Sequence, residues 1–242
     1  MTPSSLRSTV TPHHLHATAA AWSLADARQH LAQLADDEAA QIAAEAREEP
    51  ALLRSTVYGS RHGSGSHSDP VGGMLATATR PERRNRWAEM SARAERRITG
   101  IAAMLRIDGV LDPLACIIAA LPGTLPGTAA VVAKHLQDED RWIREAIGIA
   151  ALRVPILHAP CPACRCRTLH VQAEGPREAW TVVCDGSWEP GGGPHRPCLC
   201  TGAGCPCGMP GAVEGVAHIW PRDAVLGAVA GAVPSTTRSE VR

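Results

Sequence analysis

Eight of the nine cysteines in this 242-residue chain fall within 47 residues, and this density is the strongest chemical signal in the sequence. Cys161 and Cys164 are separated by two residues, the spacing of a zinc knuckle, in which both sulfurs reach one tetrahedral ion. Six further cysteines follow, and the last four form two Cys-x-Cys pairs. The sequence therefore predicts Zn²⁺ as the cofactor. Because one tetrahedral ion takes only four ligands, we expect one or two structural ions.

The predicted ligand set leaves three arrangements open. The principal candidates are seven cysteines: Cys161, Cys164, Cys184, Cys198, Cys200, Cys205 and Cys207. One zinc could use the first three of these and one later thiol. Two zincs could instead use all eight clustered cysteines, including Cys166. In the third arrangement, seven cysteines and either His218 or His195 fill two sites and leave Cys166 spare. Two sites are favoured over one, because eight thiols exceed one tetrahedral site.

Other uses of these cysteines fit the sequence less well. Disulfides are typical of secreted domains, whereas the first residues lack the apolar run of a signal peptide. The spacings do not match those of iron–sulfur proteins. Pro160, Cys161 and Cys164 match half of the zinc-deaminase signature, but the H-x-E half is missing. No H-E-x-x-H, Walker A or G-x-S-x-G motif occurs. Since thiolate-rich zinc sites are usually closed, we expect no enzymatic activity.

Composition narrows the class of protein further. Basic and acidic residues balance at 24 each, so no global field draws the chain to nucleic acid or to an anionic membrane. Aromatic residues make up 3% of the chain, so Ala, Leu, Ile and Val must build its core. No stretch approaches the ~20 apolar residues of a membrane helix. We therefore expect a soluble, cytoplasmic protein without a membrane partner.

The elements that must position the cysteines follow from periodicity and from glycine and proline content. The predicted fold class is α plus small β, with an N-terminal helical bundle followed by a C-terminal zinc-ribbon-like Cys-rich module. Two β-type runs, 168–172 and 179–183, predict a hairpin that returns the chain to the metal at Cys184. The predicted organisation is a disordered tail (1–14), an amphipathic helical segment (15–58), a flexible linker (59–79), a helical bundle (80–154), a zinc-ribbon-like module with a terminal helix (155–233) and a polar tail (234–242).

Five helical segments make up the predicted helical part. Residues 15–49 contain neither Gly nor Pro and repeat apolar residues near helical spacing. A second helix spans 81–107. Asp112 is the predicted N-cap of a third helix, and Thr128 that of a fourth. A fifth helix covers residues 142–150.

A resemblance to known proteins rests on short motifs around the cysteines. They are the knuckle Cys161 to Cys164, the stretch Arg167 to Leu169, the stretch Val182 to Cys184, the two Cys-x-Cys pairs and the stretch Ala217 to Pro221. This region resembles the zinc ribbon of uncharacterised actinobacterial and actinophage-type proteins that join a helical N-terminal part to a Cys-rich C-terminal ribbon. The resemblance implies metal binding and covers only this region. In those proteins a glycine commonly follows the second cysteine, where this chain has Arg165.

A run of arginines is the sequence feature that points to nucleic acid. Seven arginines lie within 18 residues, opposed by three glutamates: Arg80, Arg83, Arg84, Arg86, Arg93, Arg96 and Arg97. On one helix they would form a positive stripe able to contact the phosphates of double-stranded DNA. This predicts a zinc-binding, nucleic-acid-associated regulatory or accessory protein.

The same arginines also fit a second function class. They could form a solvated helix face with local ion pairs. Residues 155–221 carry four arginines against five acidic residues, so the zinc-ribbon-like module is not itself expected to contact DNA. The alternative is therefore a zinc-stabilised protein-interaction or structural accessory protein of the phage or plasmid type, with a protein partner.

Overall fold

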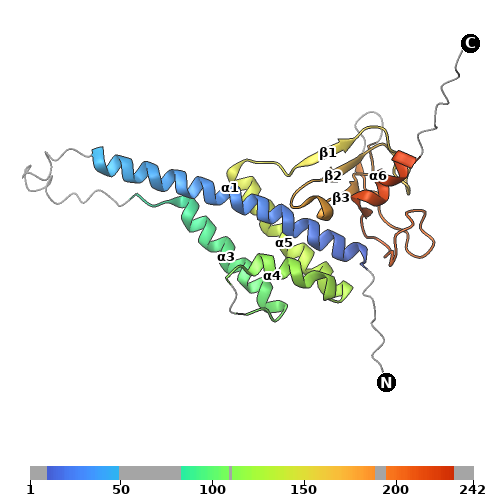
Figure 1. Cartoon of the computed structure of the whole chain (residues 1–242), viewed down its shortest axis with the longest axis horizontal. Helices are drawn as coiled ribbons and strands as arrows, with labels where there is room; N and C mark the ends of the chain where they lie inside the picture. Colours follow the sequence, from blue (N-terminus) through green and yellow to red (C-terminus); the bar gives the residue numbers. More distant parts are fainter. Residues whose placement is uncertain (1–9, 49–82, 109–110, 189–194, 232–242) are drawn as a thin grey trace, which may run out of the picture. The chain divides into compact units, whose positions relative to one another are not determined.

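The computed structural model describes residues 10–48, 83–108, 111–188 and 195–231. The chain divides into two compact units, one made of Met1–His30 with Ala94–Arg242 and the other of Leu31–Arg93. Helices dominate the N-terminal half, and a small antiparallel sheet lies in the Cys-rich C-terminal region (Figure 1). These findings confirm the α plus small β class. Among the described helices, none is both long enough and apolar enough to cross a membrane.

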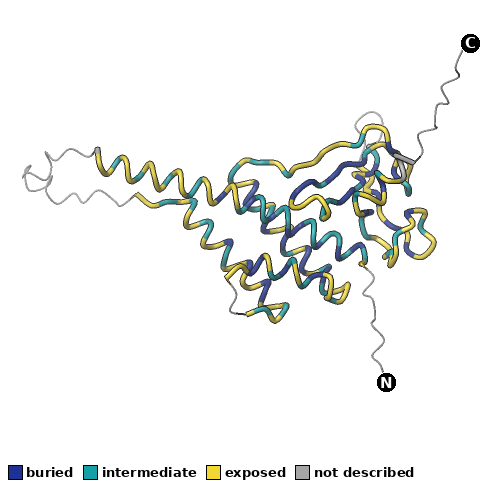
Figure 2. Tube along the Cα trace, viewed as in Figure 1, coloured by how far each residue is buried: buried dark blue, intermediate teal, exposed yellow. Residues whose placement is uncertain are grey.

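Four helices carry the N-terminal half of the described chain: α1 (Pro12–Glu48), α3 (Arg86–Met104), α4 (Pro113–Ala120) and α5 (Pro126–Ile147). Leu24 of α1, Ile98 of α3, Ile117 of α4 and Leu136 of α5 are fully buried, and all four belong to the larger unit. Within α1, buried residues recur as far as Leu31 and none is buried from there to Arg47 (Figure 2). The core of the helical part is therefore aliphatic, as the low aromatic content requires.

Short polar signals set the start of two helices. The Asp112 carboxylate accepts a hydrogen bond from the Ala115 backbone N–H, and Pro113 occupies the first turn of α4. The predicted cap at Asp112 is thereby confirmed. Helix α3 begins at Arg86 rather than at residue 81, because Asn85 Oδ1 accepts from the Ala88 N–H at 2.8 Å and caps the helix there.

Helix α5 corrects the prediction of two separate helices. A single helix runs from Pro126 to Ile147, and Thr128 lies inside its first turn instead of capping it. Residues 137–141, between the two predicted helices, contain no Gly or Pro and continue the helix. The helix ends at Gly148, whose positive φ of 73° allows the left-handed conformation common after a last helical turn.

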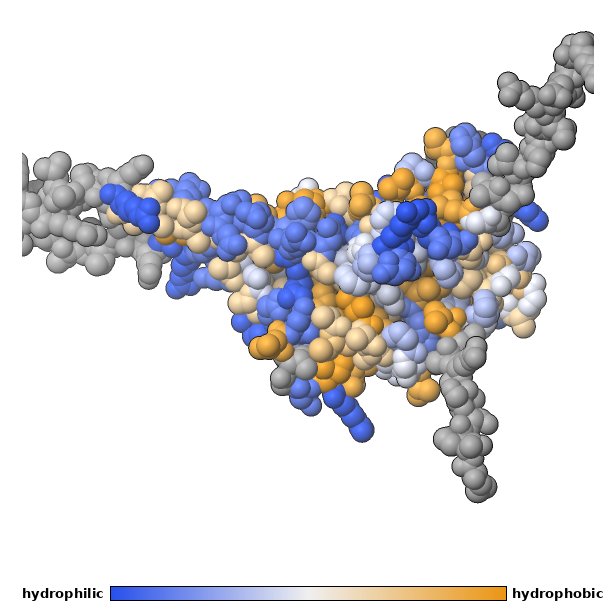
Figure 3. Space-filling model, viewed as in Figure 1, coloured by the Kyte–Doolittle hydropathy of each residue, from blue (hydrophilic) through white to orange (hydrophobic). Residues whose placement is uncertain are grey.

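Helix α4 is apolar over its whole length, with Leu, Cys, Ile or Ala at the seven positions after Pro113. Hydrophobic residues gather over this helix on the face shown in Figure 3. Leu114 and Ile117 nevertheless point into the protein and are buried. The helix therefore contributes to the core through one face.

The C-terminal region is built on a four-stranded antiparallel sheet with the order β1-β2-β3-β6. Its strands are β1 (Arg153–Ile156), β2 (Leu169–Gln172), β3 (Thr181–Cys184) and β6 (Ile219–Pro221), and β4 (Ser187–Trp188) pairs separately with β5 (His195–Arg196). The β2–β3 hairpin corresponds to the two predicted β-type runs. Strands β1 and β6 were not expected, because they are three or four residues long and each contains a proline. The expected final helix is α6 (Arg222–Gly231).

Cysteines supply much of the buried core of this C-terminal region. Five of the twelve buried residues in its main hydrophobic cluster are cysteines: Cys161, Cys184, Cys198, Cys200 and Cys207. The aliphatic contribution comes mainly from Leu169 and Val171 of β2 and Val182 of β3. A core with so few aliphatic side chains needs another source of stability, such as a metal ion.

Candidate metal centres

Four cysteine sulfurs converge to form the first candidate centre. Cys161 and Cys164 come from the turn before β2, Cys184 ends β3, and Cys198 follows β5; their ligand atoms all lie within 4.8 Å of one another. The sulfurs of Cys164 and Cys184 are 3.6 Å apart, and those of Cys161 and Cys198 are 3.8 Å apart. Four sulfurs around a tetrahedral zinc, each ~2.3 Å from the ion, are ~3.8 Å apart. The cluster therefore has the dimensions of a zinc–tetrathiolate site.

Backbone N–H groups close the loop of the first cluster and hydrogen-bond to one of its sulfurs. The Arg165 N–H donates to the Cys161 carbonyl at 3.0 Å and closes the knuckle. Arg165 has a φ of 63°, in the left-handed region that favours glycine. The Gly186 N–H donates to Cys184 Sγ at 3.3 Å. Such a donor stabilises negative charge on the sulfur.

The second candidate centre combines three cysteines and a histidine: Cys200, Cys205, Cys207 and His218, whose ligand atoms also lie within 4.8 Å of one another. Three of these residues are buried, and Cys205 is partly buried. The Gly202 N–H donates to Cys200 Sγ at 3.4 Å. His218 is placed by the chain just before β6, where the Cys200 N–H donates to the Val216 carbonyl at 2.8 Å. Each centre thus receives four ligand atoms from the protein.

The structure brings together one of the three ligand arrangements that the sequence left open. Seven cysteines and His218 form the two clusters, and Cys166 belongs to neither. The Cys166 thiol instead lies 3.7 Å from the Cys164 carbonyl oxygen. His195, the other candidate histidine, interacts through Nε2 with the Asp185 carbonyl and is not part of either cluster.

The thiols of the two clusters differ in acidity. A hydrogen bond from Cys161 lowers the pKa of Cys184 to about 5 and raises that of Cys161 above its ordinary value. Hydrogen bonding to Thr201 lowers the pKa of Cys205 to about 5, while burial raises that of Cys207 to about 11. One sulfur in each cluster is therefore a thiolate at neutral pH and at least one neighbour is a thiol. A divalent cation would stabilise further thiolates and release their protons.

An ionic network that the sequence did not reveal links the helical part of the larger unit to its sheet. The Arg144 side chain is 7% exposed and donates to Asp140 at 2.9 Å, to Asp26 at 3.1 Å and to the Ser23 carbonyl at 2.9 Å. Glu174, which follows β2, lies 3.9 Å from it. Burial raises the pKa of Asp140 and of Glu174, and the Arg144 guanidinium opposes that rise. The only local signal was the i,i+4 spacing of Asp140 and Arg144.

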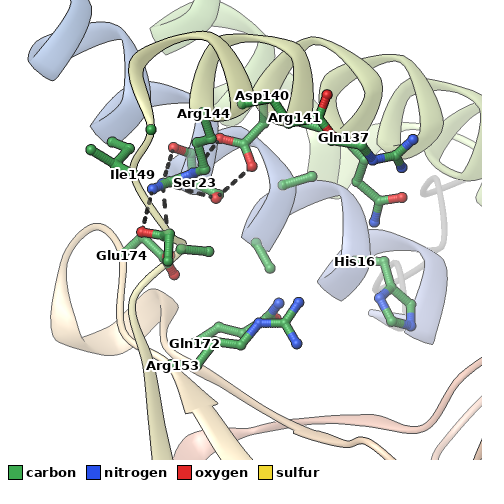
Figure 4. A pocket seen from close by; sticks show the side chains of 16 residues that line it. His16, Ser23, Gln137, Asp140, Arg141, Arg144, Ile149, Arg153, Gln172 and Glu174 are labelled. Atoms are coloured by element: carbon green, nitrogen blue, oxygen red, sulfur yellow. Dashed lines mark hydrogen bonds and ion pairs between the residues drawn. The ribbon is translucent and has the colours of Figure 1, made fainter.

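Figure 4 shows Ser23, Asp140, Arg144 and Glu174 together at one end of a cavity. The cavity has a volume of about 630 Å³. Helices α1 and α5 form one side of the cavity, and Arg153 of β1 and Gln172 of β2 form the other. His16 lines the cavity as well, and its Nε2 lies 2.9 Å from the Ala217 carbonyl oxygen. Burial lowers the pKa of His16, so its imidazole is neutral at pH 7. This network and His16 position the Cys-rich region on the helices of its own unit.

The predicted arginine stripe does not lie on one helix. Arg83 and Arg84 precede α3, and Arg80 lies outside the described residues. Arg83 forms an ion pair with Glu45 at 2.5 Å, and Arg97 lies 3.6 Å from the buried Glu139 carboxylate. Arg84 lies within ion-pair distance of Glu89, so at least three of the seven predicted positive charges are opposed by glutamates.

The six described arginines of this set are all exposed: Arg83, Arg84, Arg86, Arg93, Arg96 and Arg97. Arg84 lies 3.9 Å from Glu89, and its side chain is 83% exposed. The Arg86 guanidinium stacks over the Trp87 ring at 4.0 Å. These side chains retain charge at the surface.

Fold and site together define a class: a helical protein with a Cys-rich antiparallel sheet that carries two clusters able to hold metal ions. Comparison with known proteins adds no closer identity, since no family model, no curated protein and no solved structure matches the chain.

Proposed function

We propose that this protein binds two zinc ions at structural sites, one with four cysteines and one with three cysteines and His218. The observation that carries the proposal is the gathering of eight ligand atoms into two sets of four, each within 4.8 Å. Thiolate and imidazole ligands in tetrahedral sets select zinc over the harder divalent cations. Because the protein supplies all four ligands of each site, neither site leaves a position for substrate, which supports a structural role and no catalysis.

Metal analysis of purified protein tests this proposal. We expect two zinc ions per chain, measured by mass spectrometry of the native protein and by elemental analysis. Cys161→Ser and Cys207→Ser should each lower the zinc content by one ion, because each removes a ligand from a different cluster. Cys166→Ser is the matched control and should retain two ions. A wild-type content of zero, or an equal loss in Cys166→Ser and Cys161→Ser, would contradict the proposal.

The finer function that we propose is nucleic-acid association through exposed arginines. Arg84, Arg86 and Arg93 belong to the unit Leu31–Arg93 and are exposed, which supports contacts with phosphate. The second candidate, a protein-interaction or structural accessory protein, is favoured by the ion pairs of Arg83 and Arg97, because these pairs reduce the positive charge offered to DNA. The two candidates differ in their dependence on salt.

Fluorescence anisotropy with random duplex DNA at about 50 and 200 mM salt separates the two candidates. Three phosphate contacts predict a loss of affinity of roughly 40-fold between these concentrations. Changing Arg84, Arg86 and Arg93 to Gln should abolish most of the binding. Changing the exposed Arg47, Arg167 and Arg177 to Gln removes the same charge elsewhere and is the matched control. Absence of binding at 50 mM salt would exclude DNA association and favour a protein partner.

A further inference from the structure

His218 lies between the two candidate metal centres and contacts both. Its Nε2 is 3.2 Å from Cys205 Sγ, which belongs to the second cluster. Its Nδ1 is 3.0 Å from Cys198 Sγ, which belongs to the first cluster. The side chain is buried, with 3% of the residue exposed. The two nitrogens therefore face different centres.

We propose that His218 couples the two sites, with Nε2 as a ligand of the second ion and the Nδ1 N–H as a hydrogen-bond donor to the Cys198 thiolate of the first. This inference rests on the two zinc sites proposed above. The first cluster already has four sulfurs, so it needs no nitrogen ligand. A neutral imidazole carries one proton, and ligation through Nε2 places that proton on Nδ1. The acceptor within reach of Nδ1 is then Cys198 Sγ.

The surrounding backbone fixes His218 in this bridging position. The His218 N–H donates to the Cys198 carbonyl at 3.1 Å, and Leu199 forms a β-bridge with Ala217. Because side chains alternate along an extended segment, Cys198 and Cys200 lie on the same side of it, one at each centre, with Leu199 between them on the other. The segment therefore connects the two centres, and His218 lies beside it on the neighbouring stretch of chain.

The Trp220 side chain holds the plane of the His218 ring. The two rings are stacked, with centroids 5.6 Å apart and an interplanar angle of 13°. The indole N–H of Trp220 donates to the Cys207 carbonyl at 3.0 Å, so the indole itself is fixed to the second centre. Rotation of the imidazole away from either sulfur would require this stack to move.

The consequence is cooperative metal binding. An ion at the second site fixes the imidazole tautomer that donates to Cys198, and this donor stabilises the thiolate that the first ion needs. Loss of a hydrogen-bonding partner of a metal ligand typically lowers metal affinity about 10–100-fold. Coupling between sites is reciprocal, so the first ion should raise the affinity of the second by the same factor.

A double-mutant cycle on the full chain tests the coupling. Cys207→Ser disables the second site, and we expect the zinc affinity of the first site, measured by chelator competition, to fall at least tenfold. His218→Cys keeps a fourth ligand at the second site but has no N–H to donate to Cys198. In the His218→Cys background, we expect Cys207→Ser to leave the affinity of the first site unchanged. An equal effect of Cys207→Ser in both backgrounds, or no effect in either, would overturn the proposal.

A measurement on the unmodified protein tests the proposal even if the variants fail to fold. The ¹⁵N chemical shifts of zinc-loaded protein should show His218 with a protonated Nδ1 and a metal-bound Nε2. An unprotonated or metal-bound Nδ1 would overturn the coupling even if two zinc ions are present. A wild-type protein that holds fewer than two zinc ions would instead refute the proposed function itself.

Discussion

The helical part of the larger unit and its Cys-rich region are stabilised by different means. The helices bury aliphatic side chains that are fully excluded from solvent, among them Leu24, Ile98 and Leu136. The main hydrophobic cluster of the Cys-rich region contains twelve buried residues, and five of them are cysteines. Burial of aliphatic surface needs no ligand, whereas clustered thiols gain stability chiefly when a cation binds them. One unit therefore contains an aliphatic core that needs no ligand and a second core that the proposed zinc ions would stabilise.

This difference predicts that zinc removal unfolds one region and spares the other. Structural zinc contributes about 10–16 kcal/mol in small zinc-binding peptides, which exceeds the stability of a small sheet. With a strong chelator present, we expect backbone amides of β2 and β3 to lose their protection from hydrogen exchange while those of α5 keep it. Hydrogen exchange followed by mass spectrometry measures both regions together. Protection of β2 and β3 that survives chelation would show that the two cores do not differ in this way.

Arg144 is the point at which the two regions depend on each other, so its loss should have the next largest effect. Arg144→Ala removes the guanidinium that pairs with three carboxylates, those of Asp26, Asp140 and Glu174. Breaking a buried ion pair in this way typically costs about 3–5 kcal/mol. Denaturant unfolding measures the loss.

The control for Arg144 is Arg141→Ala, which removes a guanidinium one turn away on the same helix. The Arg141 side chain is 64% exposed, so the change should have little effect on stability. Equal losses in the two variants would show that the network around Arg144 does not hold the regions together.

Truncation in the aliphatic core should destabilise the helices without affecting the metal. Leu136 is fully buried, and Leu136→Ala should cost about 2–5 kcal/mol. The zinc content should remain at two ions per chain, because the ligands lie outside α5. Leu125→Ala is the control, since Leu125 is 76% exposed. Loss of zinc from Leu136→Ala would mean that the Cys-rich region requires the helical core for metal binding.

The smallest expected effect is the pH dependence of zinc affinity, which concerns the Cys-rich region alone. The pKa values of Cys161, Cys198 and Cys207 are raised, so these thiols are protonated at neutral pH without metal and must lose protons to bind it. Zinc affinity should therefore fall as the pH falls, by about tenfold per pH unit for each proton released. Competition with a chelator at pH 6, 7 and 8 measures the slope. An affinity independent of pH would contradict the protonation states assigned to the apo clusters.

Local sequence determined those features of this protein that depend on neighbouring residues. The two-residue spacing of Cys161 and Cys164 places both thiols in one cluster, because a single turn holds them. Asp112 caps α4 through a bond to a residue three positions later, and the runs around β2 and β3 form a hairpin. Helix boundaries were predicted less well, because the sequence predicted two helices where the single helix α5 runs from Pro126 to Ile147.

Tertiary structure alone decided how distant ligands are shared. Cys198 and Cys200 are two residues apart, yet they belong to different clusters. His218 enters the second cluster and His195 does not, because the pairing of β3 with β6 carries His218 to the cysteines. Arg144 contacts Asp26, which lies 118 residues before it in the chain. It also contacts Glu174, which follows strand β2 in the Cys-rich region. Sequence spacing constrains contacts within a turn of the chain, whereas contacts between segments depend on which surfaces pack together.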